Sequence, residues 1–596
     1  MKELEYPFDA EEIIAGKKQL KKELLKQDRP FVEKKIAILG GVTTKNIRII
    51  LELFLLNYGI KPFFYESEYD QYYEEAVFSS PQLENFGPDM IYVCTSVRNI
   101  MDFPNLSDSL EMVNEKLSAQ YHKFQEIWSC LTERFHCPVI QNNFEYPYFR
   151  LLGNKDASDM HGRVNFVTRL NLCFYEYAQN HDNFYICDIN YLSASYGLDK
   201  WSDPYYWHMY KYAAAVPAIP YLAFNVANIM KSIYGKNKKV LNLDLDNTLW
   251  GGIVGEDGAD NIEIGQETPL AQTYSEFQEY LKLHKQLGIL LTINSKNDEE
   301  NAISGLKRPD SILRTEDFVS MKANWNPKDR NLVETAEELN LLPESFVFVD
   351  DNPSERAIVS AQVPGAAVPD MGRVERYVQI LDKSGFFEVT SLSEDDLKRT
   401  KMYQENRKRS QMQAAFACYE DYLGSLEMKG EIRPFIPAYL SRIAQLTNKS
   451  NQFNLTTRRY SQSDIEAVAA DPSYITLYGK LEDKFGDNGV VSVLIGRLDG
   501  KDREELHLEL WLMSCRVLKR NMEYAMMDEL VERAAASGVK RIVGYYYPTS
   551  KNKMVKDFYK MQGFTKISED ETGNTIWMFE IAASYERKQN VIEIIK

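Results

Sequence analysis

Two aspartates, separated by a single residue, directly follow an apolar run in the middle of this chain. The run begins at residue 239, and the string DLDNTL carries Asp244, Asp246 and Thr248. Because alternate residues of a terminating strand share a side, both carboxylates should face one crevice at the carboxyl end of a parallel strand. One carboxylate could attack phosphorus while the other moves a proton. Their clustered negative charge would also recruit a hard cation such as Mg²⁺.

Two further polar clusters follow in an order that suits phosphate chemistry. Ser295, Lys296 and Asn297 come after the apolar run 289–293, where a hydroxyl and amides could hold phosphate oxygens. Lys328 stands just ahead of a helical pattern and could neutralise phosphate charge. These residue types predict a binding site for a phosphoryl group.

A last cluster, Asp350 and Asp351, ends the apolar run 345–349 and could complete the metal site. The stretches between the four clusters are each long enough for a β–α unit. Successive strands of one sheet would therefore bring all four clusters to the same edge.

In this order the clusters resemble the four-motif signature of the haloacid dehalogenase-like (HAD) superfamily. The resemblance implies that Asp244 forms an aspartyl-phosphate and that Asp246 is the general acid/base. It ranks Asp351 above Asp350 as a metal ligand, because Asp350 occupies the place of a usual glycine. The implied site residues are the catalytic Asp244 and Asp246, the phosphate-binding Ser295, Lys296, Asn297 and Lys328, and the Mg²⁺ ligands Asp244, Asp246, Asp351 and Asp350.

The strings DLDNTLWGGIVGEDG, NSKND, NWNPKDRNL and FVFVDDNPSERA resemble a narrower group, the FkbH-like branch of HAD subfamily IIIC. Residues 446–456 and 484–489 look like the C-terminal half of that group, which resembles a GNAT acyltransferase. The first region looks like the SGNH-hydrolase-like domain of its longer members. The implied α/β architecture has an SGNH-like α/β domain (1–235), a capless HAD-like Rossmannoid α/β catalytic domain (236–385), a helical linker (386–425) and a GNAT-like α+β domain (426–596).

Proteins of this kind are associated with loading a glyceryl unit from 1,3-bisphosphoglycerate onto an acyl carrier protein, with loss of phosphate. The resemblance therefore implies a Mg²⁺-dependent phosphatase or acyltransferase that uses a small phosphorylated acyl donor and a carrier protein. One departure is Asn294, where many relatives have cysteine, so a thioester at that position is not available. Two alternatives remain open: a stand-alone small-molecule HAD phosphatase, and a non-enzymatic scaffold with degenerate flanking domains.

The flanking regions depart from the patterns they resemble. SGNH catalysis needs a serine after the first strand, but this chain has Val42 and threonines there, although Asn142, Asp203 and His208 could be remnants of such a site. We therefore expect this region to be a binding module. No cap fits within residues 252–273, so the HAD crevice should be open and a lid must come from elsewhere.

The GNAT-like region has Lys519 and Asn521 where glycines usually let a helix N-terminus approach the pyrophosphate of coenzyme A. A phosphopantetheine arm is thus a better expected ligand than acetyl-CoA. Cys515 could accept an acyl group, although a small buried hydrophobe is the simpler interpretation, and His507, inside a predicted strand, should be structural.

Periodicity predicts the elements outside the HAD-like region. Strands that alternate with helices are typical of a parallel sheet. The charged segment 391–413 should be a solvated helical linker. Predicted strands are 36–39, 90–94, 138–141, 184–187, 474–477, 490–497, 506–513 and 541–546; predicted helices are 47–56, 110–135, 164–179, 520–537 and 551–562.

Composition excludes several classes of function. A chain of 596 residues needs several domains, and its net charge of −17 excludes a basic nucleic-acid-binding surface over the whole protein. Seven scattered cysteines without a CxxC pair argue against a disulfide framework. The uncharged stretch 212–230 contains two prolines and is expected to be a buried helix starting near Pro220, not a membrane span. With a charged N-terminus and no signal peptide, we expect a cytoplasmic protein that binds neither membranes nor nucleic acid.

Overall fold

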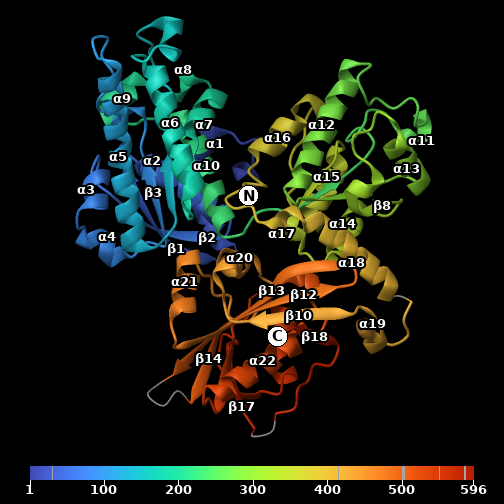
Figure 1. Cartoon of the computed structure of the whole chain (residues 1–596). Coiled ribbons are helices and arrows are strands. Elements are labelled where there is room, and N and C mark those ends of the chain that lie inside the picture. Colours follow the sequence, from blue (N-terminus) through green and yellow to red (C-terminus); the bar gives the residue numbers. More distant parts are fainter. Residues whose placement is uncertain are drawn as a thin grey trace. The chain divides into compact units, whose positions relative to one another are not determined.

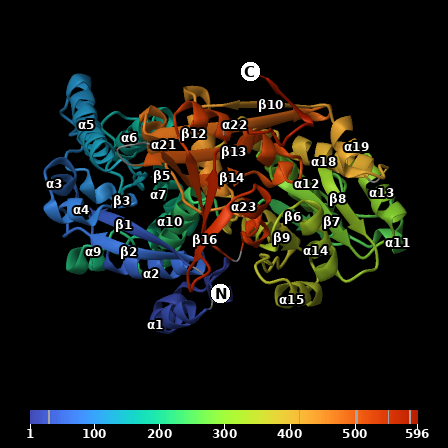
Figure 2. The same cartoon turned by 90° about the horizontal axis from the view of Figure 1, so that it is seen from below.

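The chain forms two compact units, Met1–Lys236 and Asn237–Lys596. Both are built of α/β layers (Figures 1 and 2), so the multidomain α/β class predicted from the sequence is confirmed. None of the described helices is long and apolar enough to cross a membrane. This computed structural model describes residues 1–27, 29, 31–413, 415–499, 504–549, 551–582 and 585–595.

The first unit contains a five-stranded sheet in the order β2-β1-β3-β4-β5, and every neighbouring pair is parallel. Its strands are β1 (Val32–Gly40), β2 (Ile60–Glu66), β3 (Met90–Cys94), β4 (Val139–Asn142) and β5 (Phe184–Cys187). Its helices are α1 (Ala10–Lys26), α2 (Lys45–Asn57), α3 (Tyr72–Val77), α4 (Pro81–Phe86), α5 (Leu110–Phe135), α6 (Arg163–Asn180), α7 (Ile189–Tyr196), α8 (Leu198–Trp201), α9 (Pro204–Tyr210) and α10 (Ile219–Ile233).

Helices cover both faces of this sheet (Figure 1). Ile36 and Ile38 of β1 pack in one apolar cluster with residues of α1, α2 and α10. Ala37 and Leu39 pack in another cluster with residues of α5 and α6. Alternate strand residues thus enter opposite cores, which explains why the strands are apolar throughout. The buried helix predicted to start near Pro220 is α10, which begins at Ile219 and has Pro220 in its first turn.

The second unit begins with a four-stranded parallel sheet in the order β8-β7-β6-β9. Between Gly252 and Thr268, a stretch that is described completely, the four-residue α11 (Val254–Asp257) is the only helix, and no cap is inserted there. The strands are β6 (Val240–Leu243), β7 (Leu290–Ser295), β8 (Phe318–Ala323) and β9 (Phe346–Val349). The helices are α11 (Val254–Asp257), α12 (Pro269–Gln286), α13 (Glu299–Lys307), α14 (Lys328–Glu338), α15 (Pro353–Gln362) and α16 (Tyr377–Lys383).

Helices α17 (Glu394–Leu397) and α18 (Arg399–Gln413) occupy the segment predicted to be a solvated linker. The helical part of that prediction is correct, but the solvated part is wrong. Met402 and Tyr403 are buried, and the Arg409 side chain is 2% exposed where it pairs with Asp483. The sequence does not show which face of α18 is buried, because the charged residues on that face are neutralised by partners that lie far away in the sequence.

The second sheet of this unit has nine strands, eight of them in the order β16-β17-β15-β14-β13-β12-β10-β18. The remaining helices are α19 (Tyr419–Ser425), α20 (Leu440–Lys449), α21 (Gln462–Ala470), α22 (Met522–Ala536) and α23 (Phe558–Met561). The strands are β10 (Met428–Arg433), β11 (Phe453–Asn454), β12 (Tyr474–Asp483), β13 (Gly486–Asp499), β14 (Glu505–Met513), β15 (Arg541–Tyr546), β16 (Thr565–Glu569), β17 (Thr575–Glu580) and β18 (Ile592–Ile595).

Strand β11 and the residue after it fill the gap where β14 and β15 separate. These two strands pair in parallel only over four residues each, from Glu505 to Leu508 in β14 and from Arg541 to Gly544 in β15. Beyond that point Leu455 donates its N–H to the carbonyl of Trp511 at 3.1 Å and accepts the N–H of Tyr547 at 2.9 Å. The sheet is therefore continuous at this point, because the chain supplies its own bridging segment.

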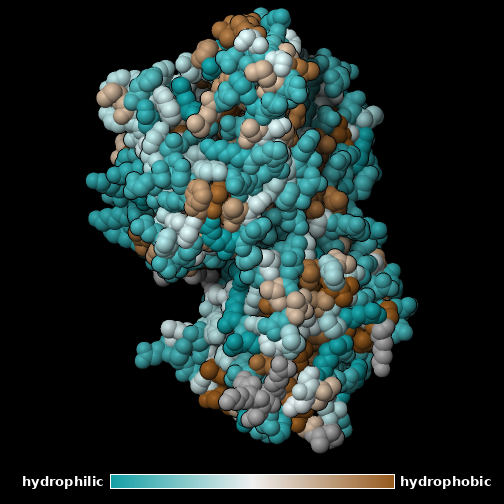
Figure 3. All heavy atoms as spheres, turned by 60° about the vertical axis from the view of Figure 1, so that its left-hand side comes forward, coloured by the Kyte–Doolittle hydropathy of each residue, from teal (hydrophilic) through white to brown (hydrophobic). Residues whose placement is uncertain are grey.

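Figure 3 shows one face of the molecule, on which hydrophobic residues lie in small groups among hydrophilic ones. This distribution is ordinary for a globular surface, where scattered apolar side chains need no partner.

Candidate active site

The polar clusters lie at the carboxyl ends of the four-stranded sheet because its strands end level with one another. Leu243, the last residue of β6, is in register with Ile293 of β7 and Val349 of β9. The next residue, Asp244, donates its N–H to the carbonyl of Val349 at 3.0 Å. Asp350 follows β9 directly, and Lys328 is the first residue of α14.

Lys328 connects two of the acidic clusters. Its Nζ lies 2.9 Å from Oδ2 of Asp244 and 2.6 Å from Oδ2 of Asp350. All three residues are buried. Burial by itself would lower the pKa of Lys328, but the two carboxylates outweigh it and raise that pKa. The lysine thus stays charged beside Asp244, where a phosphoryl group would need positive charge.

Three carboxylates form a group that could hold a metal ion. Oxygens of Asp244, Asp350 and Asp351 lie within 4.8 Å of one another. Burial, followed by the charge of Asp244, raises the pKa of Asp350 to about 6 and also raises the pKa of Asp351. The Asp351 side chain accepts no hydrogen bond from another described residue, whereas its N–H donates to Oγ1 of Thr248 at 3.2 Å. Three hard oxygen donors that carry more negative charge than Lys328 balances fit Mg²⁺.

The carboxylate of Asp246 is not part of this group of three. Its Oδ1 accepts hydrogen bonds from Nε1 of Trp250 at 2.8 Å and from the N–H of Val254 at 3.1 Å. Its Oδ2 accepts one from Nδ2 of Asn297 at 3.0 Å. The geometry therefore does not support Asp246 as a carboxylate ligand of the metal. Burial raises its pKa, which suits a group that gives and takes a proton.

The predicted phosphate-binding residues are separated by the structure. Ser295 is buried at the end of β7, and Asn297 is held by Asp246. Lys296 instead forms an ion pair with Glu355 of α15, with 2.5 Å between Nζ and Oε1. Lys328 thus lies among the carboxylates and Ser295 ends the neighbouring strand, whereas the ammonium of Lys296 is engaged by Glu355.

Three buried asparagines form a hydrogen-bonded row that holds the backbone of Lys328. From the sequence alone they were not singled out as functional. Nδ2 of Asn294 donates to the carbonyl of Lys328 at 2.8 Å and to Oδ1 of Asn242 at 3.0 Å. Asn331 in turn donates to Oδ1 of Asn294 at 3.2 Å. The sequence does contain a sign of this row: Asn242 and Asn294 stand inside otherwise apolar strands, where a buried amide needs a hydrogen-bond partner.

The structure does not assemble the possible SGNH remnants into a site. Asn142 is buried, accepts the hydroxyl of Tyr92 at 3.0 Å and donates to the carbonyl of Thr95 at 3.0 Å. Asp203 accepts the N–H of Tyr205 as the N-cap of α9. His208 is exposed on the same helix, and no ion pair joins it to Asp203 within the described chain.

The loop before α22 adopts backbone conformations that usually require glycine, although it contains none. Lys519 and Asn521 both have φ of 64°, in the left-handed region. Arg520 between them is buried and donates to Oδ2 of Asp483 at 3.1 Å. Cys515, in the short 3₁₀ helix η9 (Cys515–Val517), is half-buried with its Sγ 3.9 Å from the hydroxyl of Tyr403.

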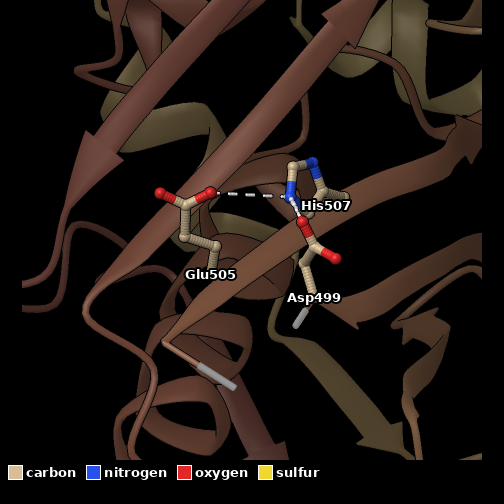
Figure 4. Close-up of side chains that lie close together, drawn as sticks. All are labelled: Asp499, Glu505 and His507. Atoms are coloured by element: carbon tan, nitrogen blue, oxygen red, sulfur yellow. Dashed lines mark ion pairs between the residues drawn. The ribbon is translucent and has the colours of Figure 1, made fainter. Parts of the chain in front are cut away.

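A second group of possible ligand atoms lies at the paired ends of β13 and β14 (Figure 4). Nε2 of His507 is 3.4 Å from Oδ2 of Asp499 and 3.7 Å from Oε2 of Glu505. Its Nδ1 is 2.8 Å from the hydroxyl of Tyr545. The Asp499 side chain is 60% exposed, so we interpret this group as an ion-pair cluster that joins neighbouring strands.

Comparison with known proteins bears on both units. Residues 35–231 match the family model described as FkbH, N-terminal domain. The match extends from β1 into α10 and supports the FkbH part of the sequence resemblance for this region. The SGNH-like interpretation of the same region stays a prediction. A search of curated proteins finds no match.

Among solved structures, the chain is similar to the N-terminal part of a Bacteroides fragilis protein that contains a phosphatase domain complexed with Mg. The two are 28% identical with a TM-score of 0.59, and the match covers 63% of this chain and 99% of the other. Weaker matches include a GNAT-family acetyltransferase from Streptococcus pneumoniae (15% identity, TM-score 0.22, 26% of this chain and 100% of the other). Another is the ribosomal-protein-S18-alanine N-acetyltransferase of Escherichia coli (12% identity, TM-score 0.21, 27% and 99%).

Proposed function

We propose that this protein is a Mg²⁺-dependent phosphatase or phosphotransferase of the HAD type, with Asp244 as its nucleophile. The observation that carries the proposal is Lys328, buried between Asp244 and Asp350 at the carboxyl edge of a parallel sheet. The similarity to a phosphatase domain complexed with Mg supports it.

The reaction would proceed in two steps. First, an oxygen of Asp244 attacks phosphorus, the bond from phosphorus to the leaving oxygen breaks, and a protonated Asp246 gives that oxygen its proton. Where the leaving group is a carboxylate, which needs no proton, Asp246 starts ionised. Water then attacks the aspartyl-phosphate and gives its proton to Asp246, which frees phosphate and Asp244. Throughout, Lys328 would stabilise the negative charge on the phosphoryl oxygens.

Asp244, Asp350 and Asp351 would hold the metal ion. When bound, Mg²⁺ would supply positive charge beside the phosphoryl oxygens. Asp246, whose carboxylate is tied to Trp250, Val254 and Asn297, remains available for proton transfer.

For the substrate we propose a small phosphorylated acyl donor such as 1,3-bisphosphoglycerate, with an acyl carrier protein as acceptor. This finer proposal rests on the sequence resemblance. Acyl transfer differs from the hydrolysis above: the carrier thiol attacks the carbonyl carbon, the carbon–oxygen bond to the 1-phosphate breaks, and the leaving phosphate takes the thiol proton. Hydrolysis of the remaining 3-phosphate by the two steps above would then leave a glyceryl thioester on the carrier. Asn294 offers no thiol, and its amide is occupied by Lys328 and Asn242, so the acyl group would pass directly to the carrier.

Phosphate release from acetyl phosphate by the full chain, with and without Mg²⁺, tests the phosphatase. Asp244→Asn should lower the rate by about 10³-fold or more while leaving the fold intact by circular dichroism. Glu267→Gln, at an exposed position outside the site, is the matched control. Undiminished release by Asp244→Asn would refute the nucleophile. Absence of any release by the wild type would favour the non-enzymatic scaffold.

Intact-mass measurement of a carrier protein incubated with the enzyme and 1,3-bisphosphoglycerate tests the finer proposal. A glyceryl adduct on the carrier supports acyl transfer. Phosphate release without an adduct identifies a stand-alone phosphatase.

A further inference from the structure

A cavity of about 120 Å³ that opens to solvent lies within the unit Asn237–Lys596, at the amino ends of strands β6 and β9. The carboxyl ends of the same strands carry Asp244 and Asp350. The cavity wall includes Lys239, directly before β6, and Ser345, directly before β9. At ~3.3 Å per strand residue, the Cα atoms of Lys239 and Asp244 are about 16 Å apart. The cavity is therefore separate from the candidate active site.

The cavity wall is strongly basic in a chain with a net charge of −17. Six cationic side chains line it against three acidic ones. Because the surrounding protein is acidic, this local excess of positive charge is not a general surface property. The cations are Lys239, Arg399, Arg442, Lys449, Arg516 and Lys551, and the acids are Glu344, Asp395 and Asp396.

Each acid already has cationic partners. Asp396 pairs with Arg399 and, at 3.2 Å, with Lys449. Asp395 lies 2.9 Å from Arg442 and 3.5 Å from Arg516, measured from Oδ2 to the Nη2 atoms. Glu344 pairs with Lys551. The three acids are thus shared among five cations, and the cavity wall keeps a net positive charge.

Two groups in this wall have unused capacity to bind an anion. Nζ of Lys239 forms no hydrogen bond or ion pair within the described residues, and Nε of Arg442 is buried without a hydrogen-bond partner. Burial lowers the pKa of Lys239, lowers that of Lys449 to about 8 and lowers that of Arg442 to about 10. Buried cations without enough counter-charge are costly, and a bound anion would remove that cost.

We propose that this cavity binds a small anion bearing phosphoryl groups. Guanidinium and ammonium groups from several elements converge on it, and arginine forks match phosphate oxygens in pairs. The proposal does not depend on the phosphatase chemistry at the other sheet edge.

Cys515 reports on occupancy because it forms part of the same wall. It is half-buried, whereas Cys418, at the start of α19, is exposed and does not line the cavity. A ligand in the cavity should shield Cys515 from alkylation and leave Cys418 reactive. Cys418 is therefore an internal control in every sample.

The experiment measures alkylation of both cysteines by peptide mass spectrometry in the full chain, with inorganic pyrophosphate as the probe. EDTA is present, and NaCl keeps the ionic strength constant. At ten times the dissociation constant, pyrophosphate should slow the modification of Cys515 about tenfold and leave Cys418 unchanged. Equal rates at Cys515 with and without pyrophosphate, or equal slowing of both cysteines, would overturn the proposal.

Variants assign the protection to the cavity. Lys239→Met and Arg442→Met should each raise the pyrophosphate concentration needed for half protection by about tenfold, and the exposed control Lys566→Met should not. Lys328→Met, in the phosphatase site, should leave protection of Cys515 intact. Protection that survives Lys239→Met and Arg442→Met but is lost in Lys328→Met would contradict a second site.

Discussion

At the scale of single residues, the candidate site divides four aspartates into two tasks. Asp244, Asp350 and Asp351 face one another, and two of them share Lys328. Asp246 is held apart by an indole N–H, a backbone N–H and an amide. The DLDNTL string alone placed both of its carboxylates near a metal, because it does not show which way each side chain turns.

This division predicts different defects for two conservative variants. Asp246→Asn should reduce kcat by about 10²- to 10⁴-fold with little change in the Mg²⁺ concentration for half-maximal rate. Asp351→Asn should instead raise that Mg²⁺ concentration, because it removes a hard ligand. Steady-state rates across a Mg²⁺ titration distinguish the two. A large shift in Mg²⁺ dependence for Asp246→Asn would contradict the assignment.

A buried carboxyl in the first unit predicts a pH effect on stability. Burial raises the pKa of Glu145 from 4.5 to about 7, while its Oε2 accepts the N–H of Val97 at 3.1 Å. The stabilising contribution of its protonated form is complete below pH 4.5 and is lost as pH rises through 7.

Glu145→Gln keeps an acceptor for Val97 and removes the titration. The variant should therefore be more stable than the wild type at pH 8, by up to about 3 kcal/mol, and not at pH 4.5. Thermal melts at both pH values measure this difference. Parallel shifts of Tm at the two pH values would show that Glu145 does not titrate in this way.

At the scale of elements, the carboxylate of Asp483 links α18 to the nine-stranded sheet. Asp483, at the end of β12, accepts two hydrogen bonds from Arg409 of α18, at 2.8 and 2.7 Å. It also accepts one from Arg520 at 3.1 Å. The Arg409 and Asp483 side chains are 2% and 0% exposed.

Asp483→Ala should destabilise the unit by about 3–5 kcal/mol, because it leaves two buried guanidinium groups without their carboxylate. Glu569→Ala is the matched control, since it breaks an exposed pair with Lys566 that contributes about 1 kcal/mol or less. Urea denaturation followed by fluorescence compares the two variants. Equal losses of stability would mean that the buried pair does not hold α18 in place.

Element by element, the sequence predicted buried strands well and packing between segments poorly. Residues 90–94 and 184–187 are strands with the predicted bounds, because apolar runs between turns leave little alternative. Strand β2 was missed because Pro62 interrupts it, which an edge strand tolerates. The burial of α18 was missed because its partner Asp483 is distant in sequence.

At the scale of the whole molecule, the division at Lys236 separates the two units by their internal contacts. The finer division at residue 385 stays a prediction. Tyr403 of α18 packs in the same apolar cluster as Val240 and Phe346, and half-buried Cys515 packs against that cluster. The four-stranded sheet thus shares a core with segments beyond residue 385.

We expect a fragment of residues 237–596 to fold and release phosphate, whereas a fragment of residues 236–385 should be less stable. The shorter fragment exposes the apolar surface that Tyr403 covers, which costs about 2–5 kcal/mol if that ring is lost. Thermal melts and phosphate release of both fragments test this. A shorter fragment as stable and active as the longer one would show that α18 and the following sheet are independent of the site.

The measurement closest to the central claim is detection of a phosphoryl group on Asp244. The full chain would be mixed with acetyl phosphate and Mg²⁺, quenched in acid within the first turnover and digested for peptide mass spectrometry. The account predicts an added phosphoryl mass on the peptide that contains Asp244, with the fragment ions placing it on that residue, and no such mass in Asp244→Asn. Rapid phosphate release by the wild type with the label on another residue, or with no label at any quench time, would contradict it.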